Sequence, residues 1–259
     1  MKKDVNIWDV EQIKKFWNWY SSNPYLKNIY FTKQVGNAIV NMLCIFGKIN
    51  GNLLDYGCGT GELLFKILKK YKKIECYGAD YSDSSIKLTN NKLINFNNWK
   101  GSKIINGLPL KYDNETFDII TCIEVLEHMT SEDLTLHLKE FFRILKNKGI
   151  LFITVPNDEN LEENYVYCPN CEFEFHRVQH LNSYSVNKIS KILNEMNFKV
   201  EFCASINLYN FQYSIKNFLL SFIERLICNF SKKLYINYSY IKNKIKKQPH
   251  LIVIASPNK

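Results

Sequence analysis

The chain has 259 residues with 46% hydrophobic and 23% charged side chains, a balance that is typical of a globular protein and excludes a disordered one. Its formal net charge is +9, but Lys is abundant from end to end. The charge therefore indicates a general bias in composition, and contact with nucleic acid is not expected. The first residues lack the apolar core of a secretion signal, and no apolar run approaches the ~20 residues of a membrane span, so we expect a cytoplasmic protein.

Strands and helices are predicted to alternate along most of the chain. Aromatic residues at helical spacing predict helices over residues 7–46, broken at Asn23-Pro24. From residue 53 the apolar pattern alternates between short strands and longer helices, which predicts a parallel sheet. The predicted strands are 53–56, 74–79, 117–122, 149–155, 199–204 and 251–255, and the predicted helices are 62–71, one from 83, 131–145 and 186–196.

The sequence divides into a helical cap over residues 1–48 and one domain over 49–259, with a late helical insertion at 207–248. The insertion combines an apolar helix with several lysines. It is interpreted either as a lid packed on the core or as a segment that touches an anionic membrane or encloses a lipid-like substrate. Six of the eight cysteines lie in apolar segments, where Cys behaves as a small core residue in a reducing compartment.

The strongest motif is a strand that runs into a glycine-rich turn and then a helix. Gly57, Gly59 and Gly61 let the backbone approach a ligand closely, and the following helix offers unpaired N–H groups. The spacing is neither that of a dinucleotide site nor that of a P-loop. Asp55 on the strand would repel a pyrophosphate but suits an ammonium or sulfonium group, so the motif favours a cationic cofactor.

A second carboxylate, Asp80, ends the next predicted strand about 25 residues later. Doubly wound folds place an acidic residue at this position to bind both ribose hydroxyls. The alternative is that Asp80 only caps the helix from residue 83.

These two motifs and three later segments resemble class I S-adenosylmethionine-dependent methyltransferases of the small-molecule type over about residues 50–157. The later segments are Gly107-Leu108-Pro109-Leu110 with 117–120, Glu124-Val125-Leu126-Glu127-His128, and Phe142-Arg143-Ile144-Leu145-Lys146 with 149–151. The resemblance implies an α/β fold with a doubly wound, Rossmann-like sheet of seven mostly parallel strands, one of them reversed.

The resemblance also implies how S-adenosylmethionine would be held. The glycine turn and Asp55 would hold its methionine end, Asp80 its ribose and Tyr81 one face of its adenine. Many relatives carry Asp near the position of Asn106, which would still bond the adenine here. The expected cofactor-binding residues are Asp55, Gly57, Cys58, Gly59, Gly61, Asp80, Tyr81, Asn106 and Glu124.

Two residues of the Glu124–His128 segment are candidates for catalysis. Glu124 and His128 are expected to face the side where the transferred methyl group would sit. His128 would act as a general base, because an unperturbed imidazole has a pKa near neutral pH. In the alternative interpretation His128 packs against or caps the helix near residue 131, and alignment of the acceptor alone would suffice for methyl transfer.

A cysteine and histidine cluster at 168–180 lies in a loop over 158–185. Cys168 and Cys171 have the spacing of a metal knuckle, and His176 and His180 would share one face of a helix, so the four are predicted zinc ligands. Two other interpretations remain open: the cysteines are unligated or form a redox pair, and His180 faces the active site instead.

The function expected from these features is transfer of a methyl group from S-adenosylmethionine, most often to an oxygen, of a small metabolite, lipid or saccharide. Two alternatives stay open. One is an RNA or protein methyltransferase, which the net charge of +9 would suit. The other is a non-catalytic, zinc-bearing scaffold that keeps the fold. The sequence does not indicate an oligomeric state.

Overall fold

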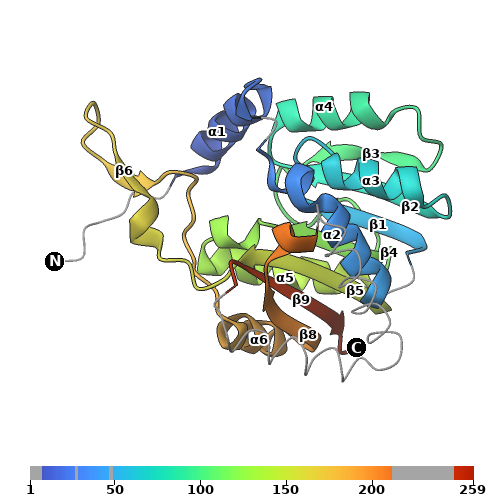
Figure 1. Cartoon of the computed structure of the whole chain (residues 1–259). Helices are drawn as coiled ribbons and strands as arrows, with labels where there is room; N and C mark the ends of the chain where they lie inside the picture. Colours follow the sequence, from blue (N-terminus) through green and yellow to red (C-terminus); the bar gives the residue numbers. More distant parts are fainter. Residues whose placement is uncertain (1–7, 27–28, 47–48, 212–247) are drawn as a thin grey trace.

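The computed structural model describes residues 8–26, 29–46, 49–211 and 248–259 (Figure 1). Most of the predicted insertion at 207–248 lies outside the described residues. Among the residues that the structure describes, no helix is both long and apolar enough to cross a membrane.

A seven-stranded sheet forms the centre of the molecule, in the order β3-β2-β1-β4-β5-β9-β8. Only β9 runs antiparallel to its neighbours β5 and β8, while the other neighbouring pairs are parallel. The predicted sheet with one reversed strand is therefore confirmed. The strands are β1 (Gly51–Tyr56), β2 (Ile74–Asp80), β3 (Trp99–Ile104), β4 (Phe117–Ile123), β5 (Leu145–Pro156), β8 (Phe198–Ile206) and β9 (His250–Pro257).

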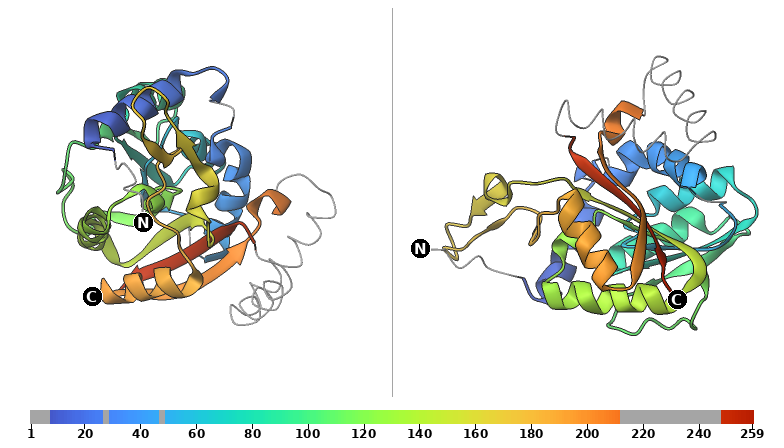
Figure 2. Two further views of the ribbon diagram at one scale, coloured as in Figure 1. Left: turned by 90° about the vertical axis from the view of Figure 1, so that its left-hand side faces the viewer. Right: turned by 90° about the horizontal axis from the view of Figure 1, so that it is seen from below.

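Helices cover both faces of this sheet (Figures 1 and 2). Alternation along β1 shows why: Leu53 packs into a core with α2, α3 and α4, whereas Leu54 packs into a core with α5 and α6, and both leucines are fully buried. The helices are α1 (Val10–Ser22), α2 (Phe31–Phe46), α3 (Glu62–Lys70), α4 (Asp83–Leu93), α5 (Ser131–Ile144) and α6 (Val186–Glu195).

The two N-terminal helices occupy different places. Helix α1 begins at a capping box, in which the Asp9 side chain accepts from the Gln12 N–H, and it lies against α4. The Asn23-Pro24 pair ends it as predicted. Helix α2 instead packs with α3 and belongs to the core on one face of the sheet.

Two features of the sheet region were not predicted. Strand β3 lies at the sheet edge, where Lys100 and Lys103 are exposed and interrupt the apolar pattern of a buried strand. The segment between β5 and α6 was expected to be irregular, yet it contains the antiparallel strands β6 (Tyr165–Tyr167) and β7 (Glu174–His176). This hairpin projects from the body of the molecule (Figures 1 and 2).

Candidate functional site

A cavity of ≈ 360 Å³ lies at the carboxyl ends of β1, β2 and β4. Strand β1 has β2 on one side and β4 on the other, so this is the switch point at which doubly wound sheets bind ligands. Residues 56–59, 80–81 and 123–125 line it from the strand ends. Helix α1 contributes Val10, Ile13, Trp17 and Tyr20, which we call the α1 wall.

The glycine turn after β1 is shaped by close contacts. Gly57 has φ of +75°, and a Cβ atom there would come 2.4 Å from Cγ2 of Val125. Gly61 has φ of +74° at the N-cap of α3, where a Cβ would lie 2.9 Å from Cγ2 of Thr89. Side chains are disfavoured at both positions for conformational and steric reasons. The turn thus brings bare backbone to the cavity.

Asp80 links this turn to the start of α4. Its Oδ2 accepts from the Gly59 N–H and its Oδ1 from the Ser82 N–H, each at 2.8 Å. Burial raises the pKa of Asp80, although these hydrogen bonds act in the opposite direction. Ser82, rather than Asp80, caps α4 by accepting from the Ser85 N–H. Asp80 also lines the cavity, where the predicted cofactor role would place it.

The other predicted cofactor residues differ in whether they line the cavity. Asp55 is 2% exposed, accepts from Thr121 Oγ1 at 2.7 Å and lies behind the cavity surface. Burial raises its pKa to about 7. Tyr81 lines the cavity with its hydroxyl 3.2 Å from His137 Nε2. Asn106 is exposed, accepts from the Lys14 ammonium and does not line the cavity, and its contact with adenine stays a prediction.

Glu124 follows β4 directly and lines the cavity. Its backbone has φ of 53°, a strained value for a residue with a side chain. The Thr154 hydroxyl donates to Glu124 Oε1 at 2.8 Å, and burial raises the pKa of Glu124 to about 7. Glu124 thus lies beside the cavity, and its part in cofactor binding or catalysis stays a prediction.

Glu127 belongs to the short helix η2 (Leu126–His128) and has a fully buried side chain. Neither of its carboxylate oxygens has a hydrogen-bond partner on another described residue, and burial raises the pKa of this group. Its backbone carbonyl accepts from the Leu181 and Asn182 N–H groups, which ties η2 to the loop of His180. A buried carboxyl group without partners is costly unless a cation or a proton neutralises it.

His128 also lines the cavity, packed edge-on against Trp17 of the α1 wall. Its Nδ1 lies 3.2 Å from the Gln179 carbonyl oxygen; because a carbonyl only accepts, Nδ1 carries the proton and Nε2 keeps a free lone pair. Burial, with His180 nearby, lowers the pKa of His128 to about 3. This pKa is lower than the near-neutral value on which the predicted base role of His128 depends. Thr130 caps α5, so His128 does not.

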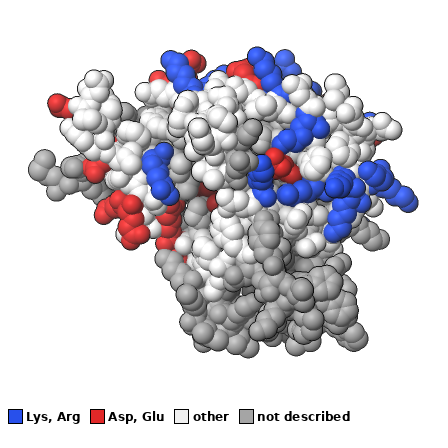
Figure 3. All heavy atoms as spheres, turned by 45° about the horizontal axis from the view of Figure 1, so that its top comes forward, with Lys and Arg blue, Asp and Glu red and all other residues white. Residues whose placement is uncertain are grey.

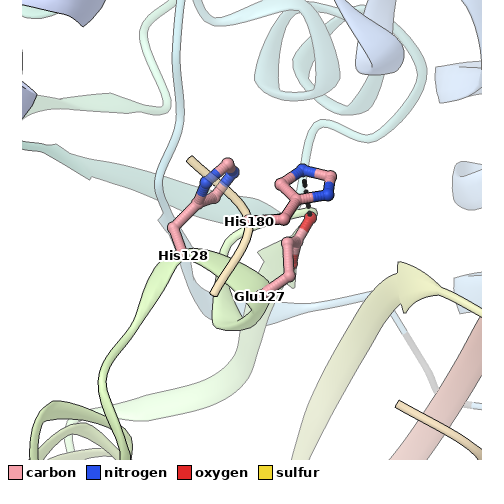
Figure 4. A group of neighbouring side chains, drawn as sticks. All are labelled: Glu127, His128 and His180. Atoms are coloured by element: carbon pink, nitrogen blue, oxygen red, sulfur yellow. Dashed lines mark ion pairs between the residues drawn. The ribbon is translucent and has the colours of Figure 1, made fainter. Parts of the chain in front are cut away.

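His180 completes this group (Figure 4). Its Nε2 lies 3.9 Å from Glu127 Oε1, and its Nδ1 lies 2.5 Å from Glu159 Oε2, to which it donates. A carboxylate that holds one imidazole nitrogen in this way leaves the other nitrogen free to bind a metal. The His176 ring stacks on His180, and His176 Nδ1 accepts from the His180 N–H at 2.9 Å.

The four predicted zinc ligands do not meet at one point. His176 ends β7 rather than lying on a helix, so the predicted helical face is wrong. Among the described residues, two groups have ligand atoms within 4.8 Å of one another and neither includes a cysteine; they are Glu127, His128 and His180, and Glu159, His176 and His180. Cys168 and Cys171 lie at the tip of the hairpin, where the Cys171 and Asn170 N–H groups lower the pKa of Cys168.

Sequence reasoning missed three residues that shape this site. Glu127 is adjacent to His128 in the recognised motif, and its type alone makes it a candidate ligand. Glu159 and the Gln179 carbonyl act by orienting histidines distant in sequence, for which the sequence carries no local signal.

The strand order, the glycine turn, Asp80 and a cavity at the switch point define an α/β protein that binds a nucleoside cofactor. Residues 38–201 match the family model of the methyltransferase domain. The chain belongs to this family.

Curated relatives agree with this assignment, and a solved structure shares the fold. The chain is 31% identical over 158 residues to the ubiquinone biosynthesis O-methyltransferase of Coxiella burnetii, covering 58% of this chain and 63% of that one. It is 30% identical over 115 residues to the small RNA 2'-O-methyltransferase of Arabidopsis thaliana, covering 41% and 12%. These relatives are matched over less than two thirds of their length. The methyltransferase solved with the Haloferax volcanii Trm112 activator shares the fold, with a TM-score of 0.62 and 15% identity. The match covers 94% of this chain and 98% of that one.

Proposed function

We propose that the protein transfers the methyl group of S-adenosylmethionine to an oxygen atom of a small acceptor, and that a divalent cation held by Glu127, His128 and His180 positions that oxygen. The observation that carries the proposal is the buried Glu127 carboxyl group, which has no hydrogen-bond partner on another described residue and lies 3.9 Å from the His180 Nε2 atom. The names of both relatives, which are O-methyltransferases, support oxygen as the acceptor atom.

The cofactor side of the cavity fits S-adenosylmethionine. Bare backbone at Gly57 and Gly59 leaves room for a ligand, and the Asp80 carboxylate lines the cavity where ribose hydroxyls would donate to it. Tyr81 provides an aromatic surface on the same side. When bound, S-adenosylmethionine supplies an electrophilic methyl carbon on a sulfonium sulfur.

The acceptor side would combine a metal with a base. Two imidazoles and one carboxylate suit a first-row divalent ion and leave coordination positions open, and such an ion lowers the pKa of a hydroxyl group placed against it. We assign proton removal to Glu124, because its pKa is raised to about 7 and it lies on the cavity wall. His128, with its low pKa, acts as a ligand.

The acceptor itself would be small and at least partly apolar. Trp17, Tyr20, Tyr30 and Ile13 line the cavity, and stacking or burial against such side chains favours an aromatic or lipid-like molecule. A nucleic-acid acceptor is the second candidate, because one relative is named as a small RNA 2'-O-methyltransferase. In Figure 3 acidic side chains gather on the side of the β6–β7 hairpin, which makes that part of the surface unfavourable for phosphates.

Calorimetric titration with S-adenosylmethionine tests the cofactor, with Asp80→Asn as the weakened variant. We expect binding in the micromolar range that the variant loses. A radiolabelled methyl-transfer screen with phenols, lipids, sugars and RNA, with and without Mn²⁺ or Zn²⁺, then tests the acceptor. Transfer that needs the metal supports the proposal. Absence of cofactor binding by the folded protein contradicts the methyltransferase function, whereas full activity in chelator contradicts only the metal.

A further inference from the structure

The β6–β7 hairpin ends in a tight turn that carries Cys168 and Cys171. The Cys168 N–H donates to the Phe173 carbonyl at 2.9 Å, and the Glu172 N–H donates to the Cys168 carbonyl at 2.8 Å. Glu172 adopts φ of 58°, which reverses the chain directly after the second cysteine. The turn thus holds both cysteines at the tip of the hairpin, in the Cys-x-x-Cys spacing of a metal knuckle.

The two thiols make only half of a metal site. A structural zinc ion takes four ligands with Zn–S distances of about 2.3 Å, so its ligand atoms lie about 4 Å apart. The nearest histidine along the hairpin, His176, is three residues beyond Phe173 in an extended strand, a separation of about 10 Å. Among the described residues, neither cysteine belongs to a group of three ligands. Two more ligands must come from elsewhere.

The same hairpin exposes apolar side chains beside the cysteines. Val166, Tyr167 and Phe173 are 40%, 60% and 50% exposed, and all three lie on the two short strands or the turn between them. Cys171 is exposed as well. A two-stranded ribbon of this length gains little stability by itself, and the hairpin stands clear of the body of the molecule (Figures 1 and 2).

We propose that this hairpin is a dimerisation element in which Cys168 and Cys171 of two copies of this chain bind one zinc ion through four thiolates. Two-fold symmetry makes the contact self-complementary: each copy supplies the half site that the other lacks, and the exposed apolar side chains of the two hairpins cover each other. Each thiol loses its proton to solvent on binding, with no change in oxidation state. The inference does not depend on the proposed methyl transfer.

Light scattering after size exclusion, with zinc analysis of the full-length protein, tests this proposal. The wild-type chain is expected to be a dimer, and a strong chelator should convert it to a monomer that added Zn²⁺ restores. Cys171→Ser should be monomeric and should contain half a zinc ion per chain less than the wild type. Cys203→Ser, at a half-buried cysteine of β8, is the matched control and should remain dimeric.

Cobalt titration gives a second measurement that needs no variant. Co²⁺ added to the metal-free wild-type protein should produce intense thiolate-to-cobalt absorption whose final intensity corresponds to one four-thiolate centre per two chains, because the second proposed cation site has no thiolate ligand. Saturation at one equivalent in a monomer would overturn the proposal, as would a dimer that survives Cys171→Ser. Cys228 lies outside the described part of the chain. Loss of the metal in Cys228→Ser would also overturn the proposal, because it would show that a further ligand comes from the same chain. A Cys168–Cys171 disulfide in the purified protein, detected by mass spectrometry, would do the same.

Discussion

The proposed cofactor and acceptor sides of the cavity are built in different ways. The cofactor side consists of backbone and of residues from two consecutive strand ends, with Gly57, Gly59 and Asp80 within about 25 residues of one another. The acceptor side consists of side chains from distant segments, because Glu127, Glu159 and His180 meet only when the loop after β5 folds back on η2. Local motifs therefore define the cofactor side, and tertiary packing defines the acceptor side.

The largest effect on activity is expected at Glu127, where a substitution should alter the acceptor side and leave the cofactor side intact. Glu127→Gln removes the charge that would balance a cation, so metal-dependent methyl transfer should fall at least about 100-fold while affinity for S-adenosylmethionine stays the same. Initial rates with saturating cofactor and calorimetric titration measure the two quantities. A variant that keeps its rate, or that loses cofactor binding instead, would contradict the division.

Glu159 tests the acceptor side through a residue that orients a ligand. Glu159→Gln weakens the hydrogen bond that fixes His180, and loss of such a partner lowers metal affinity by about 10–100-fold. Competition with a fluorescent chelator measures the metal affinity. Glu162→Gln, an exposed carboxylate in the same loop, serves as the control and should change nothing. Equal effects in the two variants would show that general charge, and not orientation of His180, is responsible.

Asp55 predicts a pH effect on the cofactor side. Its pKa is raised from 3.8 to about 7 in the folded protein, so the folded state holds this proton more tightly than the unfolded state. Stability contributed by the protonated form is present at low pH and is lost as the pH rises toward about 7. Asp55→Asn should therefore become more stable relative to wild type, by about 2 kcal/mol, between about pH 5.5 and pH 7.

Chemical denaturation of both proteins across this range measures the difference in the free energy of unfolding. Because the side-chain amide introduced by Asp55→Asn can still accept from the Thr121 hydroxyl, loss of the hydrogen bond does not obscure the result. A difference that is independent of pH would mean that Asp55 is ionised throughout.

The smallest effect concerns the close approach at Gly57. Gly57→Ala adds a Cβ that meets Val125 and forces a left-handed alanine, and the left-handed conformation alone costs about 1–2 kcal/mol. Gly101→Ala is the matched control, because Gly101 has φ of +99° but nothing within 4 Å of the added atom. Thermal unfolding and cofactor titration should show a larger loss at Gly57. Identical losses would indicate that conformation alone, and not the contact, restricts this position.

How well the sequence predicts the structure also differs between the two sides of the cavity. The strands beside the glycine turn were predicted because short, largely apolar stretches alternate there with helical patterns, and Asp80 ends the second of these strands and lines the cavity. The low pKa of His128 could not be predicted, because it depends on burial beneath Trp17 and beside His180. The pairing of His176 with Tyr165 in a hairpin, rather than on a helix, depends on long-range contacts that helical spacing does not reveal.

The α1 wall is expected to influence which acceptors this cavity selects. Residues 10–22 lie outside the 38–201 segment that defines the family, yet Trp17 and Tyr20 line the cavity from this helix. The helix is joined to the rest of the chain through Pro24 and rests on α4. Replacement of these 13 residues would change the shape offered to an acceptor without touching Gly57 or Asp80. We therefore expect acceptor preference to depend on a helix that lies outside the shared domain.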